Sequence, residues 1–539
     1  MTLIVHNVKL PLGSTEEDLP RHVGKFLGMA PRSLHKIVVQ RRSLDCRKGR
    51  PPHWVYAVLV DLDHETSERL VEKGKARRWD PQPVEVPFRE QIPRPVVVGT
   101  GPAGLFCAWR LVQGGASPRI LERGPEVVER SKRWHRFVEG GDFDPECHLL
   151  YGEGGAGTYS DGKLYTRVQD PRVPEVLEAL VEFGAPEEIL IDARPHVGSN
   201  LLPSIVKRMR LALEAQGAEF FFEHRLTDLI VEENENSRTI SKVVIETNGE
   251  QYNWNAEALF LAAGHSARDV YRMLAKHRVP MSPKPFQIGV RVEHPQITID
   301  QMQYGESAGH PQLPPADYSL VSSGSGQDVY SFCMCPGGEI LPSTERAGYL
   351  CVNGASRYQR KSPWANSGFV ITLEPESFED DADPLAGIAL QERIERAAFE
   401  AAGGDFSAPA LRLRDFLDGS ISTDLPDSSY PRNLTPTSFE KIFPAQILDP
   451  IRAGLSDLVS RFPEFGDADA LVTAPESRSS SPVRIDRNPD TYESQGIERL
   501  FPLGEGAGFA GGILSAALDG MKAAEVWLSR CSSLDQSKQ

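Results

Sequence analysis

Hydrophobic and polar residues are patterned in a way that sets the first 92 residues apart from the rest of the chain. Apolar positions alternate over residues 3–10, 35–44 and 53–63, as they do in half-buried strands. Residues 14–18 are a plausible capping region, and the apolar residues that follow it up to Leu27 have the spacing of an amphipathic helix. A second helix is expected over residues 65–73. A last strand is expected over residues 83–88. The order βαββαβ is the ferredoxin-like pattern, so we expect a separate module of that fold over residues 1–92.

A different pattern follows, in which a short apolar run leads into glycines and a helix. Val96–Val98 predicts a buried parallel strand, and Gly99, Gly101 and Gly104 supply the tight turn and close contacts of a dinucleotide site. The next helix offers its N-terminal amides to a pyrophosphate. Residues 116–121 predict the second strand. Glu122 ends it, 18 positions after Gly104, where a carboxylate accepts hydrogen bonds from a ribose.

A second glycine-rich segment lies at residues 152–163. Gly152, Gly154 and Gly157 again spell G-x-G-x-x-G, but no clean strand precedes them and the following residues are poor helix formers. We therefore reject a second dinucleotide fold. Glycines beside Thr158, Ser160 and Lys163 favour close approach to a planar ligand or to phosphates. Lys163 is a candidate to lie against the ring of such a planar ligand.

The C-terminal part returns to the strand–glycine–helix pattern. Residues 258–268 predict a buried strand that ends in a small-residue turn. Residues 500–520 predict a strand, an acid at its tip, glycines and a small-residue helix. The acid is Glu505, which suits the hydroxyls of a ribityl chain. An N-terminal phosphate loop combined with this C-terminal segment favours FAD over NAD as the bound nucleotide.

The fold class predicted from these elements is α/β with α+β insertions. We expect an FAD-binding domain of glutathione-reductase type, Rossmann-like, in two parts at residues 93–269 and 491–528. Between them, residues 270–490 have strand-like and helical segments, including a helix over 385–402, which predict an inserted substrate or cap domain with a mixed, mostly antiparallel sheet. The polar tail at residues 529–539 is expected to be disordered.

Composition and charge narrow the classes of function that this chain could have. The chain has 539 residues and a net charge of −16, which disfavours a general nucleic-acid binder. Residues 1–92 carry +4, however, and the remainder −20. Trp54 and Tyr56 next to the basic turn at residues 45–50 faintly resemble an RNA-stacking sheet, although packing on the sheet face is the favoured interpretation.

Cellular location is predicted from three features. No apolar run reaches the length of a membrane helix, and the N-terminus lacks the features of a secretory signal. The seven scattered cysteines suit reduced thiols. We therefore expect a cytoplasmic protein without a membrane span.

Few residues stand out as catalytic candidates. Lys163 could lie against the flavin N5 or C2 carbonyl. Cys333 and Cys335 are two apart, so in a strand they would share a face and could exchange electrons with a flavin, although two buried apolar residues are the favoured interpretation. Arg478 and Arg484, which lie amid hydroxyl residues, could clamp a carboxylate or phosphate, but a structural salt-bridge network is favoured. Arg291, at the end of a predicted strand, is a further weak candidate. No ligand spacing supports a metal site.

Several blocks of the sequence resemble the uncharacterised FAD-dependent dehydrogenase family, also called NAD(FAD)-utilising dehydrogenases. The resembling blocks are residues 99–104, 152–164, 263–269, 284–286, 289–294, 331–338, 481–485 and 504–508. The resemblance covers residues from about 95 to 525 and implies a glutathione-reductase-type FAD fold with an inserted substrate domain. It implies no reaction. Ala262–Ala263–Gly264 stands where related flavoproteins often have Ala-Thr-Gly, which puts one polar contact in doubt.

We therefore predict an FAD-dependent oxidoreductase, a dehydrogenase or reductase, that acts on a small molecule the sequence does not name. NAD(P)H is kept as a candidate electron donor, although no second nucleotide fold supports it. The alternatives are a flavin-dependent tRNA-modifying protein that uses the basic N-terminal module, and a flavin-binding interaction or sensor protein without turnover. The sequence does not specify an oligomeric state. The predicted cofactor-binding residues are Gly99, Gly101, Pro102, Ala103, Gly104, Glu122, Arg123, Gly157, Thr158, Ser160, Asp161, Lys163, Leu164, Leu226, Ala263, Gly264, His265, Gly504, Glu505, Gly506, Gly512 and Ile513.

Overall fold

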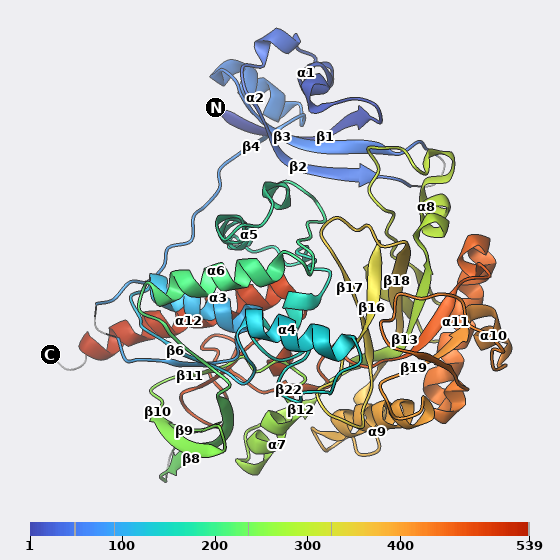
Figure 1. Cartoon of the computed structure of the whole chain (residues 1–539). Coiled ribbons are helices and arrows are strands. Elements are labelled where there is room, and N and C mark those ends of the chain that lie inside the picture. Colours follow the sequence, from blue (N-terminus) through green and yellow to red (C-terminus); the bar gives the residue numbers. More distant parts are fainter. Residues whose placement is uncertain (48–49, 91, 236, 325, 537–539) are drawn as a thin grey trace.

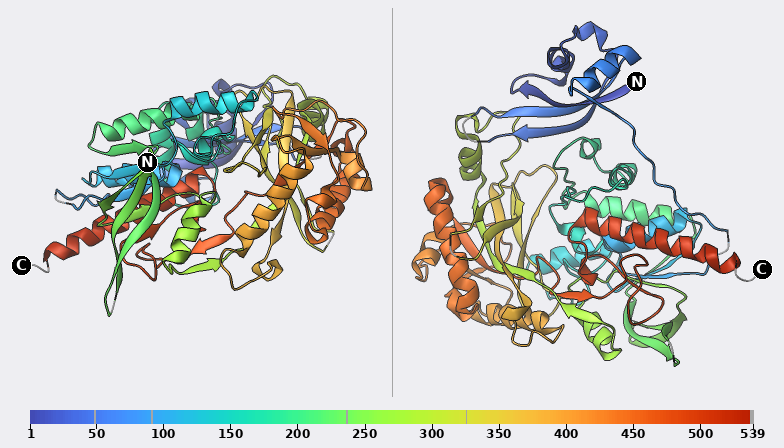
Figure 2. Two further views of the ribbon diagram at one scale, coloured as in Figure 1. Left: turned by 60° about the horizontal axis from the view of Figure 1, so that its bottom comes forward. Right: turned by 180° about the vertical axis from the view of Figure 1, so that it is seen from behind.

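The computed structural model shows an N-terminal module above two larger parts that lie side by side (Figure 1). It describes residues 1–47, 50–90, 92–235, 237–324 and 326–536, with the backbone alone for residues 532–536. Lys48 and Gly49 of the predicted basic turn lie outside the described residues. Views from below and behind show the same separation (Figure 2), with the parallel-sheet part joined to the cap part along a seam.

The N-terminal module has the predicted βαββαβ order. Its sheet is antiparallel with strand order β2-β3-β1-β4, and α1 and α2 supply the helices. The elements are β1 Thr2–Pro11, α1 Leu19–Leu27, β2 Ile37–Asp45, β3 His53–Asp61, α2 His64–Glu72 and β4 Arg77–Arg78.

The predicted last strand of this module was misplaced. No strand forms over residues 83–88; β4 is Arg77–Arg78 instead, opposite Leu3 and Ile4 of β1. Pro83 and Pro87 lack the N–H groups that a ladder needs, so the stretch between them cannot pair as an ordinary strand.

The aromatic residues of β3 pack inside the module. Tyr56 is buried and Trp54 packs against the cluster formed by Leu19, Val23 and Val58. The buried Tyr56 and the half-buried Trp54 thus pack on the core of the module, which was the favoured interpretation.

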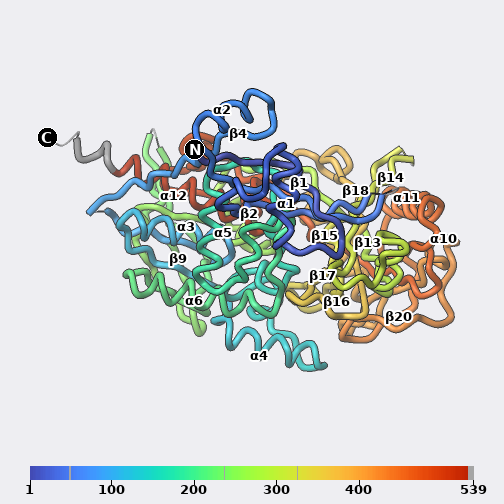
Figure 3. Tube along the Cα trace, turned by 90° about the horizontal axis from the view of Figure 1, so that it is seen from above, coloured from blue at the N-terminus to red at the C-terminus, as the bar shows by residue number. Residues whose placement is uncertain are grey.

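The module contacts both larger parts. On one side Arg42 Nε lies 2.5 Å from Asp192 Oδ1, and the Arg42 N–H donates to Ile191 O at 2.7 Å. On the other side the Gly13 N–H donates to Gln312 Oε1 at 2.7 Å. Seen from above (Figure 3), the module therefore lies across the seam and is tied to each side by separate bonds.

A five-stranded parallel sheet is the centre of the parallel-sheet part. Its strand order is β23-β11-β5-β6-β7. The strands are β5 Val96–Val98, β6 Arg119–Glu122, β7 Glu219–Phe222, β11 Leu259–Leu261 and β23 Leu500–Pro502. β11 pairs in parallel with both β5 and β23, so the segments near residues 100 and 505 belong to one sheet. The two glycine-bearing segments identified in the sequence thus lie on one body.

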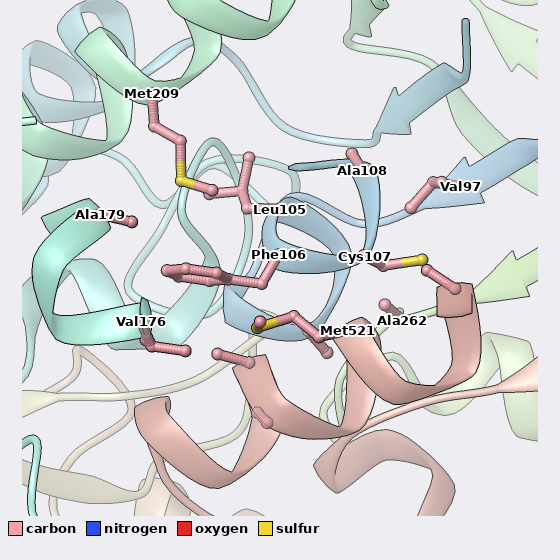
Figure 4. Packing of buried hydrophobic residues seen from close by; sticks show 14 of the residues in the cluster. Val97, Leu105, Phe106, Cys107, Ala108, Val176, Ala179, Met209, Ala262 and Met521 are labelled. Carbon is pink, nitrogen blue, oxygen red and sulfur yellow. The ribbon is translucent and has the colours of Figure 1, made fainter. Parts of the chain in front are cut away.

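Helices pack around α3, which follows the first strand. Figure 4 shows Phe106 of α3 among Val176 of α5, Met209 of α6 and Met521 of α12. α3 is apolar nearly all round, as a helix covered on several sides must be. The helices of this part are α3 Pro102–Gln113, α4 Val127–Val138, α5 Val173–Glu182, α6 Leu202–Glu214, α7 Arg268–Lys276 and α12 Ile513–Gln536.

A three-stranded antiparallel sheet is attached beside this body. It consists of β8 Arg225–Glu233, β9 Arg238–Thr247 and β10 Glu250–Asn255.

The cap part contains a seven-stranded mixed sheet of order β14-β15-β18-β13-β21-β19-β20, antiparallel except for the β19–β20 pair. The strands are β13 Phe286–Pro295, β14 Val321–Ser322, β15 Val329–Cys335, β18 Trp364–Leu373, β19 Ala408–Arg412, β20 Leu434–Pro436 and β21 Leu471–Glu476. The helices are α8 Gln296–Tyr304, α9 Ala386–Ala401, α10 Leu413–Asp418 and α11 Ala445–Arg461. The mostly antiparallel sheet predicted for the insertion is thus present.

Two small ribbons mark the edges of the cap. β12 Met281–Pro283 pairs with β22 Val483–Ile485 where the chain enters and leaves it. β16 Gly338–Pro342 pairs with β17 Val352–Ser356 on the side that faces α4 in Figure 1.

The C-terminal tail differs from its prediction. Helix α12 continues to Gln536, past Ser529 where disorder was expected; residues 537–539 lie outside the described residues. Residues 529–536 contain no proline or glycine to end a helix that is already nucleated, and Ser529 Oγ donates back to Glu525 O at 2.8 Å. Within the described ranges, no helix combines the length and apolar character needed to cross a bilayer.

Candidate functional site

The predicted phosphate loop forms the turn between β5 and α3. Gly99 has φ +97°, a conformation that favours glycine, and a methyl group added to Gly104 would overlap the Gly99 carbonyl oxygen. Gly101 caps α3 and Pro102 occupies its first turn. The first amides of α3 have no partner within the helix, so they form an anion-binding end.

The second glycine-rich segment lies directly on this loop. The Gly154 N–H donates to Thr100 O at 3.1 Å, and a Cβ added to Gly155 would lie 3.0 Å from Gly101 Cα. The segment continues as a short 3₁₀ helix, η3 Gly155–Tyr159, rather than an α-helix. This agrees with our rejection of a second dinucleotide fold.

The C-terminal segment completes the arrangement. A Cβ added to Gly157 would lie 3.3 Å from Ile513 Cγ1 and 3.5 Å from Pro102 Cγ. One added to Gly504 would lie 2.9 Å from Ala103 Cβ. Three segments far apart in sequence therefore meet at the N-terminus of α3, as the sequence predicts for a single cofactor site.

Three glycines around this site have open space beside the backbone. An added Cβ at Gly101 meets only Gly155 Cα, at 4.0 Å, one at Gly264 meets nothing within 4 Å, and one at Gly512 meets only Ser515 Oγ at 3.8 Å. These open positions, unlike crowded Gly99 and Gly104, leave room for a ligand beside the backbone. The residues present therefore fit FAD.

Glu122 is arranged differently from the prediction for a ribose-binding acid. Its Oε2 accepts from Thr100 N–H and Oγ1–H, at 3.0 and 2.6 Å. Its Oε1 accepts from Gly124 N–H and Gly152 N–H, both at 3.0 Å. Four donors fill the acceptor capacity of a carboxylate. Glu122 thus ties the two glycine loops together, and its ribose role stays a prediction that would require some of these bonds to be exchanged.

Glu505 lies at the tip of β23, as predicted. Its Oε1 accepts from the Ser481 N–H at 2.8 Å, and burial raises the pKa of its carboxyl. Lys284 is close enough for the Glu505 charge to act on it, and burial lowers the pKa of that lysine. No feature of the sequence near either residue indicated this relationship, because 221 positions separate them.

The other predicted residues around this tip are also located by the fold. Burial, followed by the charge of Arg478, lowers the pKa of His265 to about 3. Gly506 approaches Gly264 so closely that an added Cβ would lie 2.8 Å from the Gly264 carbonyl carbon. Ala263 is half-buried before it, and Leu226 is buried in the attached three-stranded sheet.

A buried charged cluster forms where the glycine-rich segment meets the cap. Lys163 Nζ lies 3.5 Å from Asp161 Oδ2 and contacts Met334 O of β15. Asp161 also accepts from Ser356 Oγ and from Arg360, whose NH2 lies 3.1 Å from Oδ2. Although burial raises it, Lys163 and Arg360 lower the pKa of Asp161 to about 2. The sequence analysis missed Arg360, since it lies 199 positions from Asp161 without a local motif.

The remaining cofactor candidates lie around this cluster and loop. Thr158 is buried with Oγ1 directed to Glu153 O at 3.4 Å, and Ser160 Oγ donates to Gly157 O at 2.8 Å. Leu164 is in the buried core. Arg123 pairs with Glu146, Nε to Oε2 2.7 Å, and with Asp269, so its positive charge is compensated by carboxylates of the protein.

The catalytic candidates fall into two places. Arg291 lies with Cys333 and Cys335 beside Lys163: its NH1 donates to Cys333 O at 3.4 Å, and its Nε lies 2.8 Å from Glu476 Oε2. Arg484 lies elsewhere, exposed, with its guanidinium 5.3 Å from the Phe509 ring centre. Arg478, the other arginine of the suggested clamp, is buried and pairs with Glu395, NH2 to Oε2 2.7 Å, so the structural network favoured for it is present. Within the described residues, no group of three or more His, Cys, Asp or Glu side chains could hold a metal ion.

Both cysteines lie in β15, as the predicted strand requires, but the strand is irregular at these residues. Pairing of β15 with β18 shifts register between Phe332 and Cys335, and Cys333 has φ +47°. A β-bulge of this kind changes side-chain direction locally, so the alternation of a flat strand does not apply.

Comparisons with known proteins agree with this geometry. Residues 94–291 match a family described as FAD binding domain, and residues 285–479 match one described as FAD-dependent protein, C-terminal domain-like. A Clostridium beijerinckii relative, described as "Uncharacterized protein", is 37% identical over 533 residues, covering 97% of this chain and 98% of the relative.

The solved structures that resemble this chain are more distant in sequence. A geranylgeranyl bacteriochlorophyll reductase-like protein from Thermoplasma acidophilum has 12% identity and a TM-score of 0.36, covering 82% of this chain and 79% of that one. A flavoprotein/dehydrogenase from Cytophaga hutchinsonii has 12% identity, the same coverage and a TM-score of 0.35. From the two family matches and the full-length relative, this chain belongs to the same family of FAD-dependent proteins as that relative and takes FAD as its cofactor.

Proposed function

We propose that this FAD-dependent oxidoreductase is a dehydrogenase or reductase acting on a small molecule at the seam between the parallel-sheet part and the cap. The observation that carries the proposal is the meeting of residues 99–104, 152–160 and 504–513 at the N-terminus of α3. When bound, FAD supplies the redox chemistry, and the protein supplies binding and orientation. The α3 amides hold the pyrophosphate, and Glu505 is the acid for the ribityl hydroxyls.

The seam supports a substrate position beside the glycine-rich segment. It contains a cavity of about 20 Å³ whose lining includes Leu149, Ser160, Leu341, Ser343 and Asn353. This volume holds about one water molecule. A substrate larger than water therefore enters only when the loop or the cap moves outward, and closure afterwards excludes water from the reacting groups.

The positive charge beside the seam suits a substrate on which negative charge develops during the reaction. Lys163 belongs to the loop side and contacts the cap through Met334 O. Burial lowers the pKa of Lys163, but Cys333 and Asp161 together raise it, so the ammonium stays charged. A fixed cation here would stabilise negative charge that develops on a nearby substrate.

Binding of the cofactor is tested by the colour of the purified protein. Wild type is expected to show the absorbance of bound flavin. Gly101→Val is expected to be colourless, because the valine side chain fills the open space in front of α3. Gly324→Val is the matched control, since Gly324 is exposed and an added Cβ there meets nothing within 4 Å. A coloured Gly101→Val protein would contradict this position for the pyrophosphate.

The reaction class is tested with electron donors. Anaerobic stopped-flow mixing with NADH or NADPH is expected to bleach the flavin, and steady turnover with an electron acceptor is expected to follow. Absence of bleaching with both donors rejects nicotinamide as the donor. Absence of turnover with every donor–acceptor pair supports the flavin-binding sensor instead.

A further inference from the structure

The bulge in β15 brings two cysteine side chains together. The Cys335 thiol donates to the Cys333 carbonyl oxygen, with 3.2 Å between Sγ and O, so the two residues are in direct contact. Neither is in a disulfide. The positive φ of Cys333 is a conformation that a residue with a side chain rarely adopts, so the surrounding structure holds this cysteine in place.

Two cations from different elements lie against this thiol pair. Lys163 Nζ is 3.9 Å from Cys333 Sγ, and Arg291 NH1 is 3.4 Å from Cys333 O. Cations and hydrogen-bond donors near a sulfur stabilise its thiolate. The hydrogen bond from Cys335 lowers the pKa of Cys333, burial opposes it, and Lys163 and Arg291 lower it further. The same hydrogen bond and burial raise the pKa of Cys335.

The pKa of Cys333 is shifted in the opposite direction from the pKa values of the other cysteines of the described chain. Burial raises the pKa of Cys46, Cys107, Cys147, Cys351 and Cys531. Cys333 is half-buried rather than fully enclosed, whereas Cys335 behind it is buried. A partly exposed thiolate and a protonated thiol two residues away are the parts of a thiol–disulfide exchange site.

We propose that Cys333 and Cys335 form a redox-active dithiol, in which Cys333 attacks a low-molecular-weight disulfide and Cys335 resolves the product. The Cys333 thiolate forms a bond to one sulfur of the disulfide, and the other sulfur leaves as a thiolate. The Cys335 thiol then loses its proton to the leaving thiolate and attacks Cys333 Sγ, which releases the second sulfur as a thiolate that takes a proton from water. One disulfide becomes two thiols, and the dithiol becomes a Cys333–Cys335 disulfide. Since the electrons go to the added disulfide, this step does not depend on the proposed flavin reaction.

The test uses purified wild-type protein, reduced and then exposed to oxidised glutathione. Thiol counting is expected to show the loss of two of the seven thiols, and peptide mapping is expected to find a disulfide between Cys333 and Cys335. Cys335→Ser is expected to accumulate a glutathione adduct on Cys333, and Cys333→Ser is expected to lose no thiol at this site. Cys46→Ser is the control, because it removes another half-buried cysteine and should behave as wild type.

The role of Lys163 is measured separately by alkylation. Iodoacetamide is expected to modify Cys333 about tenfold faster than Cys46 at neutral pH, and Lys163→Met is expected to remove most of that difference. If wild-type protein keeps all its thiols in oxidised glutathione, or if Cys333 is alkylated no faster than Cys46, the proposal is wrong. These wild-type measurements do not require any variant to fold.

Discussion

Glu122 accepts a hydrogen bond from the backbone amide of Gly152, with 3.0 Å between Oε1 and N, and so connects the first parallel strands to a loop 30 residues further on. The same carboxylate holds Thr100 through its other oxygen. One buried acid therefore determines how closely the two glycine-rich loops approach each other.

Replacing this acid should loosen both loops. Glu122→Gln puts an NH₂ group opposite amide donors, so at least one accepted hydrogen bond is lost and a donor is left without a partner. We expect a loss of about 1–3 kcal/mol in the free energy of unfolding, measured by urea denaturation. Glu379→Gln, whose side chain is 86% exposed, should change it by less than about 0.5 kcal/mol. Equal effects for the two variants would contradict the role assigned to Glu122.

The close contact between β5 and α3 should not tolerate a methyl group on Gly104. In Gly104→Ala the new Cβ overlaps the Gly99 carbonyl oxygen, so α3 must move away from the strand. We expect a destabilisation of about 1–3 kcal/mol and weaker retention of flavin on gel filtration. Gly324→Ala has open space and should retain both properties. Full flavin retention in Gly104→Ala would show that the helix can shift without affecting the site.

Because Arg291 and Glu476 form an ion pair, the effects of replacing them on the free energy of unfolding should be strongly coupled. Both side chains are buried, and burial raises the pKa of Glu476 while Arg291 lowers it. Arg291→Met leaves the carboxylate without its partner and is expected to cost about 3–5 kcal/mol. The double variant Arg291→Met/Glu476→Leu is expected to recover most of this loss in urea denaturation. Simple addition of the two single effects would contradict the coupling.

Acid should destabilise the cap through His294. This side chain is buried and its Nε2 bonds Phe465 O at 2.8 Å; burial, partly opposed by this bond, lowers the pKa of His294 to about 4. The unfolded chain, with a histidine pKa of about 6.5, takes up a proton more readily than the folded one. The stability contribution is therefore complete above pH 6.5 and lost as the pH falls towards 4, by about 3 kcal/mol.

The measurement compares wild type with His294→Leu in urea at pH values from 7.5 to 4. The variant should be less stable at pH 7.5, and its free energy of unfolding should fall less steeply with decreasing pH. His6→Gln, which changes an exposed histidine, should keep the wild-type slope. Parallel curves for wild type and His294→Leu would show that another group controls the acid response.

Local chemistry made much of the fold predictable. Gly99, Gly101 and Gly104 predict a strand–turn–helix because each is needed for a backbone conformation or a close contact within a few residues. The alternation over residues 3–10 and 53–63 likewise predicts the N-terminal strands. The error at residues 83–88 arose because two prolines were read as part of a strand, although they cannot donate to one.

The sequence by itself determined which residues could bind an FAD pyrophosphate, since a phosphate loop is a property of one short segment. Only the tertiary structure decided what Glu122, Lys163 and Cys333 contact. Their partners are the Gly152 amide, Met334 O and the Lys163 ammonium, supplied by separate segments of the chain. Hydrogen bonds and charge effects act over a few ångströms in space, and spacing along the chain does not record which distant residues the packed sheets and helices bring within that range.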